Sequence, residues 1–175
     1  IVLVEKLQTL FRHPKILWLG QNYLYDTQYF ERFWGFLPLN VHDTMIAHHA
    51  MYSNMRKGLD FLSSLYAEDH IYWKDESKEW DASLGEEQLW IYNCKDCCVT
   101  WEIYPKIKAE GHSDSPGESK WRAHQSFQQS LFFPVLRMMT RGLRRDVAKI
   151  EELRKDLTLS GLERQEALNL MAGHY

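Results

Sequence analysis

The chain has 175 residues, of which 45% are hydrophobic and 14% aromatic, and its formal net charge is -3. This composition supports a buried core and excludes a largely disordered chain, while the charge gives no support to a nucleic-acid binder. The sequence contains no apolar run of about eighteen residues and no signal peptide, so we expect no membrane span.

All three cysteines, Cys94, Cys97 and Cys98, lie close together. An odd, clustered set is a poor disulfide framework and favours reduced thiols, which predicts a cytoplasmic location. Cys94 and Cys97 form a CxxC pair, but a second ligand pair at zinc spacing is missing. The surrounding pattern is typical of a helix interior, so we expect neither a zinc site nor a thioredoxin-like motif.

The first part of the chain alternates between helical and extended patterns. Residues 2–11 have the apolar spacing of an amphipathic helix, and the short apolar run 16–19 predicts a buried strand. A helix over 21–34 and a second strand over 37–41 follow. The alternation indicates an α/β domain.

Helices dominate the residues after this alternation. Asp43 is a candidate N-cap for a helix that continues to about Met51. Apolar spacing predicts further helices over 59–66 and 86–107, and the polar, aromatic stretch 69–84 is typical of a loop.

Glycine, serine and proline between residues 111 and 117 give the clearest linker signal in the chain. Residues 121–139 and 146–157 then predict two helices separated by Gly142. We therefore expect an all-helical start of another unit after the α/β part.

Two short patterns carry polar residues suited to chemistry. Asp26 opens a helix directly after a strand, at the edge where α/β sheets usually bind ligands. Tyr92 and Asp96 lie four residues apart in a helix, so their side chains share a face and could share a water and a metal. Taken singly, Asp26 is better explained as a solvated helix-start carboxylate and Tyr92 as a core aromatic.

In combination, these patterns resemble the proofreading exonuclease domain of family A DNA polymerases over roughly residues 1–110. Gly20–Asp26 is similar to the family's second exonuclease motif, and Tyr92–Asp96 with Val99 and Thr100 is similar to the third motif of the tyrosine (DEDDy) subtype. Between these motifs, Asp43–His49 and Leu59–Leu62 are similar to the helices that follow the second motif in the family. The stretch Tyr72–Glu76 is similar to phage-type members in particular.

Beyond the linker, Leu131–Asp146 resembles the segment where such polymerases enter the polymerase domain, although Thr140 stands where the family has an acidic residue. The resemblance implies a partial 3′→5′ exonuclease domain over 1–110, a linker over 111–120 and the helical start of a polymerase domain over 121–175. It also implies a ribonuclease H-like α/β fold whose N-terminal strands are missing from this chain.

The resemblance implies two-metal hydrolysis with Mg²⁺ or Mn²⁺ at the 3′ end of single-stranded or primer–template DNA. Asp96 would be a ligand of the water-activating metal, and Asp26 would serve the second metal through waters. Tyr92 would orient the attacking water, and Asn22 would contact the terminal nucleotide or support Asp26. Deoxynucleotides would be bound by the rest of the polymerase domain.

Several other polar residues have competing explanations. Asp43 is better suited to an N-cap than to the site. A joint metal site of His42, His48 and His49 is not expected, because the adjacent His48 and His49 point apart on a helix. Arg56 and Lys57 either touch phosphate or form a solvated face, and Tyr72 and Trp73 either stack on bases or pack in the loop.

The largest departure from the family is the absence of its first motif, an Asp-x-Glu pair, from residues 1–21. Glu5 is the sole acidic residue before Asp26. The chain therefore resembles a domain cut in the middle. We expect it to lack half of the metal ligands, to be inactive alone, and to be poorly stable because of an exposed sheet edge.

Three alternatives remain at this point. A ribonuclease D-like RNA exonuclease shares the tyrosine motif, but the polymerase-like stretch from Leu131 argues against it. The presence of Asp26, Tyr92 and Asp96 argues against a structural relic that has lost its carboxylates, but the missing first motif leaves this alternative open. The third alternative is an unrelated α/β domain with accidental motifs.

Overall fold

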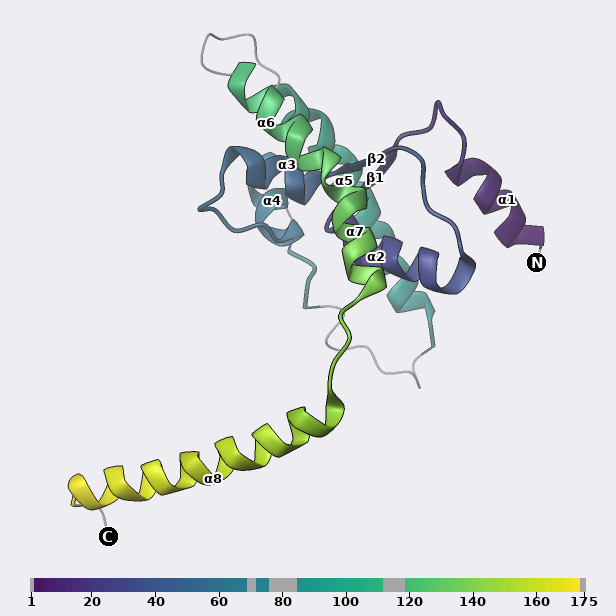
Figure 1. The fold of residues 1–175 in the computed structure, drawn as a ribbon. Coiled ribbons are helices and arrows are strands. Elements are labelled where there is room, and N and C mark those ends of the chain that lie inside the picture. Colours follow the sequence, from purple (N-terminus) through teal and green to yellow (C-terminus); the bar gives the residue numbers. More distant parts are fainter. Residues whose placement is uncertain (1, 69–71, 76–84, 112–118, 174–175) are drawn as a thin grey trace. The chain divides into compact units, whose positions relative to one another are not determined.

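A computed structural model describes residues 2–68, 72–75, 85–111 and 119–173 (Figure 1). The chain divides into two compact units, Ile1–Thr140 and Arg141–Tyr175, which we describe separately.

The described part of the first unit is mostly helical and contains two short strands. In chain order its elements are α1 (Val2–Phe11), β1 (Trp18–Gly20), α2 (Tyr23–Tyr29), the π-helical η1 (Phe30–Trp34), β2 (Val41–Asp43), α3 (Thr44–Met51), α4 (Leu59–Tyr66), α5 (Glu87–Gly111), α6 (Ser119–Ser130) and α7 (Phe132–Arg141). The described part of the second unit contains the helix α8 (Val147–Met171).

The two strands form a parallel pair joined by a helical crossover. The register places Trp18 opposite Val41, Leu19 opposite His42 and Gly20 opposite Asp43. Because α2 and η1 lie between the strands in the sequence, β1, α2, η1 and β2 make a βαβ unit. The carboxyl ends of both strands therefore meet at one edge of the sheet, where α2 and α3 begin.

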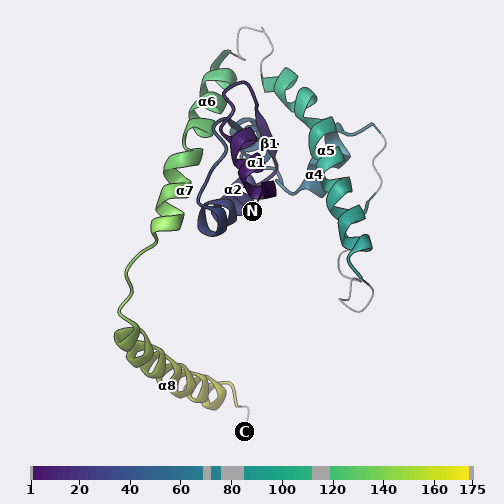
Figure 2. The ribbon, with the colours of Figure 1, turned by 90° about the vertical axis from the view of Figure 1, so that its right-hand side faces the viewer.

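Apolar side chains form two clusters around this small sheet. The first cluster is made by α3, α4, α5 and the segment 72–75, and its buried members are Ala47, Met51, Leu59, Leu62, Trp73, Ile103 and Ile107. The buried members of the second cluster are Tyr23, Phe132 and Leu136. Figure 2 shows α5 on one side of the strands and α6 with α7 on the other. The strands are thus covered from both sides.

Helix α1 is attached to the rest of the unit through Phe11, which is 3% exposed. Its ring centroid lies 4.1 Å from that of Trp18 and 5.2 Å from those of Phe30 and Phe36. The carbonyl oxygen of Phe11 also accepts a hydrogen bond from the Leu39 N–H at 2.8 Å. One aromatic side chain therefore joins α1 to β1, η1 and the segment before β2.

The fully buried carboxylate of Asp43 accepts hydrogen bonds from the first backbone N–H groups of two helices. Its Oδ1 accepts the N–H groups of Met45 at 2.9 Å and Ile46 at 3.4 Å, which confirms the predicted N-cap of α3. The same carboxylate accepts the N–H groups of Asn22 at 3.1 Å and Tyr23 at 2.7 Å at the start of α2. Burial raises the pKa of the Asp43 carboxyl, and these four backbone hydrogen bonds oppose that shift.

Gln129 connects α6 to β2 by pairing with the backbone of Asp43. Its Nε2 donates to the Asp43 carbonyl oxygen at 2.7 Å, and its Oε1 accepts the Asp43 N–H at 3.1 Å. Both backbone groups point away from β1, so α6 covers the outer edge of β2 at its carboxyl end. One turn earlier on α6, Gln125 is also buried.

His48 lies fully buried among aromatic rings on α3 and α4. Its ring centroid is 5.3 Å from Tyr52, 6.4 Å from Phe61 and 5.9 Å from Tyr66, and neither ring nitrogen has a hydrogen-bond partner among the described residues. Burial lowers the pKa of His48, partly opposed by the charge of Glu110. The hydroxyls of both tyrosines donate to the Glu110 carboxylate, which ties α5 to α3 and α4.

The helices predicted over 2–11 and 59–66 are confirmed at their predicted bounds. The predicted strand over 16–19 is found two residues later, at Trp18–Gly20. The prediction of a second strand over 37–41 is wrong, because β2 covers Val41–Asp43. Pro38 has no N–H for a strand ladder, and the Leu39 N–H bonds to α1 instead.

The prediction of one helix over 121–139 is also wrong. The chain breaks at Leu131 into α6 and α7. Pro134 lies in the first turn of α7, where a missing N–H costs no intrahelical bond. The next helix, α8, has Asp146 as its N-cap and continues to Met171 rather than to residue 157. Most of the predicted linker lies outside the described residues.

Replacing Asp43 with alanine removes the acceptor shared by the starts of α2 and α3. We expect Asp43→Ala to lower the free energy of unfolding by about 3 kcal/mol, because buried N–H groups would lose a charged acceptor. Urea denaturation measures the change. The control is Asp60→Ala. It removes a partly exposed ion pair with Arg56 at 3.6 Å, which should lower the free energy of unfolding by about 1 kcal/mol or less. Equal losses would contradict the assigned role.

The lowered pKa of His48 predicts that the free energy of unfolding decreases in acid. The pKa of His48 in the folded state lies below its usual value of 6.5. Below pH 6.5 the unfolded chain therefore binds a proton at His48 that the folded chain does not bind. The free energy of unfolding should therefore decrease as pH falls from 6.5 toward the lower pKa of the folded state. Urea midpoints across this range should fall less for His48→Phe than for the wild type. An identical pH dependence would rule out His48 as a cause.

Candidate functional site

A cleft of about 800 Å³ lies at the carboxyl ends of the strands, between the start of α2 and the middle of α5. The polar and aromatic side chains of its lining that matter here are Asn22, Asp26, Lys57, Lys74, Asp96 and Trp101. Three of the four residues predicted for the site, Asn22, Asp26 and Asp96, thus line one cavity. The fourth, Tyr92, lies one turn before Asp96 on α5.

The turn between β1 and α2 depends on a close approach of backbone and ring. A Cβ on Gly20 would lie 2.3–2.6 Å from atoms of the Tyr23 side chain, which leaves room for glycine alone. Asn22 then adopts a left-handed conformation with φ 55°, which asparagine tolerates better than most residues. This turn places Asp26 in the first turn of α2, facing the cleft.

Partial desolvation in the cleft raises the pKa of the Asp26 carboxyl, and a backbone hydrogen bond opposes that shift. Burial is the larger of these two effects, so the net shift is upward. A cation entering the cleft would stabilise the ionised carboxylate.

Tyr92 and Asp96 share one face of α5, as their spacing predicted. The Nζ atom of Lys74 lies 3.0 Å from the Tyr92 hydroxyl and 2.7 Å and 2.8 Å from the two Asp96 carboxylate oxygens. Burial lowers the pKa of Lys74, but the hydrogen bonds and charge of Asp96 and Tyr92 outweigh it, so the net shift is upward. The ammonium therefore joins the two side chains.

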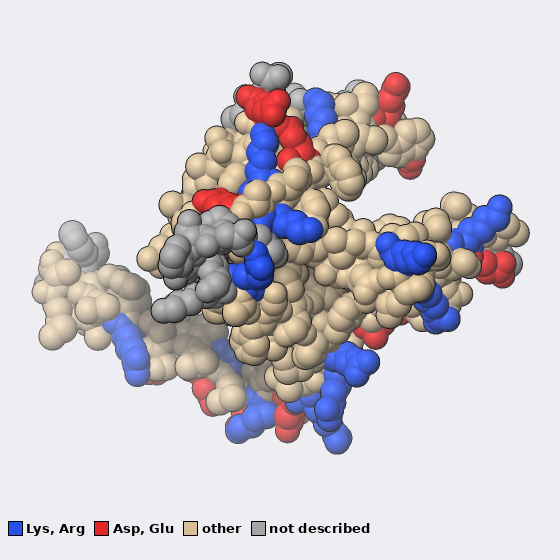
Figure 3. Space-filling view, turned by 90° about the horizontal axis from the view of Figure 1, so that it is seen from above, with Lys and Arg blue, Asp and Glu red and all other residues tan. Residues whose placement is uncertain are grey.

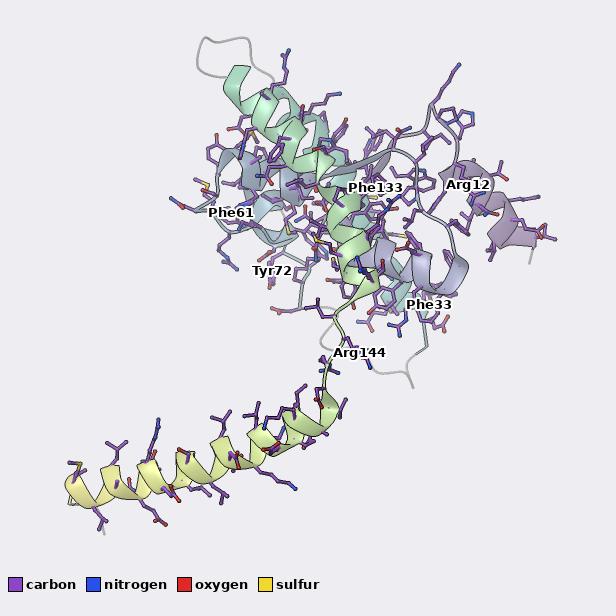
Figure 4. The ribbon with its side chains drawn as sticks, in the orientation of Figure 1. Arg12, Phe33, Phe61, Tyr72, Phe133 and Arg144 are labelled. Carbon is purple, nitrogen blue, oxygen red and sulfur yellow. The ribbon has the colours of Figure 1, made fainter. Side chains whose placement is uncertain are left out.

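The carboxylate of Asp96 is also fixed by a buried indole. The Nε1 of Trp73 donates to Asp96 Oδ1 at 2.7 Å, and Trp73 is 4% exposed within the first apolar cluster. Of the two roles considered for Trp73, stacking on bases and packing within the protein, its burial agrees with packing. Tyr72, in contrast, is 53% exposed on the segment that follows α4 (Figure 4).

The chemistry of the cleft suits a hard divalent cation in part. Asp26 and Asp96 supply carboxylate oxygens from two different helices, the ligand type that Mg²⁺ and Mn²⁺ prefer. Within the described ranges, however, no three His, Cys, Asp or Glu side chains are close enough together to hold a metal ion. The two carboxylates thus fit part of a coordination shell.

The remaining candidates are dispersed. His48 lies in the core, and His42 packs its ring 5.0 Å from that of Tyr104. Lys57 lines the cleft, whereas Arg56 pairs with Asp60. The three cysteines are free and exposed.

The cleft also contains polar and aromatic residues that were not singled out from the sequence, among them Lys74, Asn93 and Trp101. Lys74 belonged to the phage-like stretch 72–76, but no pattern indicated that it would reach α5. Asn93 and Trp101 lie on α5 near the predicted pair, and Trp101 is 73% exposed. A helical projection around Asp96 could have found both.

The surface is mixed in charge. On the face shown in Figure 3, Lys and Arg side chains alternate with Asp and Glu among large uncharged areas, in keeping with the net charge of -3. No helix in the described parts of the chain has both the length and the apolar character that crossing a membrane requires.

The contact between Trp73 and Asp96 can be tested directly. Asp96→Ala removes the acceptor of the Trp73 indole, so we expect exchange of the indole N–H proton to accelerate by about tenfold or more. Nuclear magnetic resonance measures this exchange. Asp26→Ala is the matched control, because Asp26 lies on α2, and it should leave the rate unchanged. Equal rates in wild type and Asp96→Ala would contradict the contact.

Comparison with known proteins agrees with the motifs. Residues 2–112 match the family described as 3′–5′ exonuclease. Over 107 residues the chain is 31% identical to DNA polymerase I of Borreliella burgdorferi, an alignment that covers 58% of the chain and 12% of that polymerase. No solved structure matches the chain. Because the family match covers more than half of its length, the chain belongs to the 3′–5′ exonuclease family of the DNA polymerase I type.

Proposed function

We propose that the protein to which this chain belongs removes nucleotides from the 3′ end of DNA as the proofreading exonuclease of a DNA polymerase. The observation that carries the proposal is the meeting of Asp26 and Asp96 in one cleft, although they are seventy positions apart in the sequence. Family membership supports the reaction type, and the relative named DNA polymerase I supports the link to synthesis.

In this proposal Asp96 and Asp26 are metal ligands, with Asp26 acting through waters. Two Mg²⁺ or Mn²⁺ ions would activate the attacking water and stabilise the leaving 3′ oxygen. Tyr92, one turn before Asp96, orients the attacking water through its hydroxyl. Asn22 contacts the terminal nucleotide from the turn before α2. The remaining ligands come from the family's first motif, which residues 1–21 do not contain.

The proposed fold is a ribonuclease H-like sheet of which β1 and β2 are the described part. We assign 1–110 to the exonuclease domain, 111–120 to a linker and 121–175 to the start of the polymerase domain. Helices α6 and α7 nevertheless pack within the same compact unit as the exonuclease residues. This packing supports a close attachment of the two proposed domains.

The proposed substrate is a single-stranded 3′ end or a primer–template whose end has frayed. Trp101 is exposed at the cleft and offers an aromatic surface for a base. Lys57 and Lys74 offer positive charge for the phosphates. Deoxynucleotides would be bound by the polymerase domain.

The test is the release of 3′ nucleotides from single-stranded DNA in Mg²⁺, using a protein extended upstream to include the first motif. We expect Asp96→Ala and Asp26→Ala each to lower the rate by about a hundredfold or more, because each removes a metal ligand. Tyr92→Phe should lower it by about tenfold, through loss of the hydroxyl that orients water. The control is Asp60→Ala, which removes an acidic side chain that does not line the cleft.

Each other outcome has a definite meaning. Activity that survives both aspartate substitutions would refute the site assignment. A strong preference for an RNA oligonucleotide would favour a ribonuclease D-like enzyme, and complete inactivity of the extended wild type would indicate a structural relic. The 175-residue chain alone should be inactive, so a metal-dependent rate from it would contradict the need for the first motif.

A further inference from the structure

Lys74 occupies a special position in the cleft, because its ammonium group contacts the carboxylate proposed to hold metal. It lies within 2.8 Å of both Asp96 oxygens and 3.0 Å from the Tyr92 hydroxyl. Its side chain is only 23% exposed. It also lies 5.0 Å from the Tyr92 ring centroid and 5.2 Å from that of Trp73. Three described side chains thus form its binding site.

This arrangement satisfies Asp96 in the absence of any other cation. A partly buried carboxylate without a positive neighbour would be costly, and the ammonium provides the compensating charge. Trp73 adds a second donor to Oδ1 of the same carboxylate. Both Asp96 oxygens therefore accept hydrogen bonds from donors in the segment 72–75.

An ammonium held between both Asp96 oxygens competes with a divalent ion for the same carboxylate. A metal ligand must offer a free lone pair at about 2.0–2.2 Å from the ion, and the ammonium would then lie beside a second positive charge. Release of Lys74 from Asp96 therefore favours the coordination of a metal there.

We propose that Lys74 is an internal counter-ion that competes with the divalent cation for Asp96 and so sets the metal concentration at which the site fills. The inference rests on the proposed function, since it takes Asp96 as a metal ligand. Its quantitative form is simple: the apparent dissociation constant equals the intrinsic one divided by the fraction of molecules in which Lys74 is released. A Lys74 that is bound in about nine molecules of ten therefore weakens metal binding about tenfold.

Lys57 provides the matched control. It lines the same cleft, and its carbonyl oxygen, rather than its side chain, accepts the hydrogen bond from Gln21 at 2.7 Å. No hydrogen bond or ion pair between the Lys57 ammonium and Asp96 occurs among the described contacts. Lys57→Met thus removes a similar charge from the cleft without removing the competitor.

The experiment is a Mn²⁺ titration of the protein extended upstream to include the first motif, followed by paramagnetic broadening of the Trp73 indole N–H signal. The indole donates to Asp96, so an ion at Asp96 must broaden this signal. We expect Lys74→Met to lower the Mn²⁺ concentration for half-broadening by about tenfold. Lys57→Met should change it by about twofold or less, and Lys74→Arg, which keeps the charge, should resemble the wild type. The Trp73 signal before Mn²⁺ is added reports whether each variant is folded.

The outcomes separate this inference from the proposed function. Equal half-broadening concentrations in wild type and Lys74→Met, with broadening abolished by Asp96→Asn, would overturn the competition and leave the metal assignment intact. Equal decreases in the Lys74→Met and Lys57→Met variants would show a general charge effect and also overturn it. Broadening in no variant, or broadening that persists in Asp96→Asn, would overturn both the inference and the role of Asp96 as a ligand.

Discussion

The buried carboxylate of Asp43 is the interaction on which the rest of the first unit depends. It stands at the end of β2 and accepts four backbone N–H groups, two from the start of α2 and two from the start of α3. A helix start that is buried needs an acceptor for its free N–H groups, and here one side chain serves two helices. The geometry of the strand ends is therefore fixed by an aspartate that does not line the cleft.

That constraint also explains how the two candidate carboxylates are held. The position of the Asp26 carboxylate depends on the orientation of α2. Asp43, on the neighbouring strand, fixes that orientation through its hydrogen bonds to the start of α2. Asp96 depends instead on α5 and on Trp73, whose indole bonds to it from the first apolar cluster. The two sides of the cleft are thus positioned by separate parts of the core, and a change in one apolar cluster should displace one carboxylate more than the other.

The features that the sequence predicted well are local. The N-cap at Asp43, the helix 59–66 and the shared face of Tyr92 and Asp96 each follow from spacing within one element. The second strand was misplaced because its bounds are set by the tertiary contacts of Leu39 and Gly20 rather than by its own apolar run. The contact of Lys74 with α5 joins positions that are far apart in the chain, and no periodicity reports such a contact.

Gln129 has a consequence for how the small sheet can grow. A side-chain amide that pairs with both the N–H and the C=O of a strand residue copies the bonding of a neighbouring strand without being one. The backbone groups at the carboxyl end of β2 are therefore not available to pair with another strand, because Gln129 of α6 already bonds to them. Of the two strands in the pair, it is β2 whose outer edge is closed in this way.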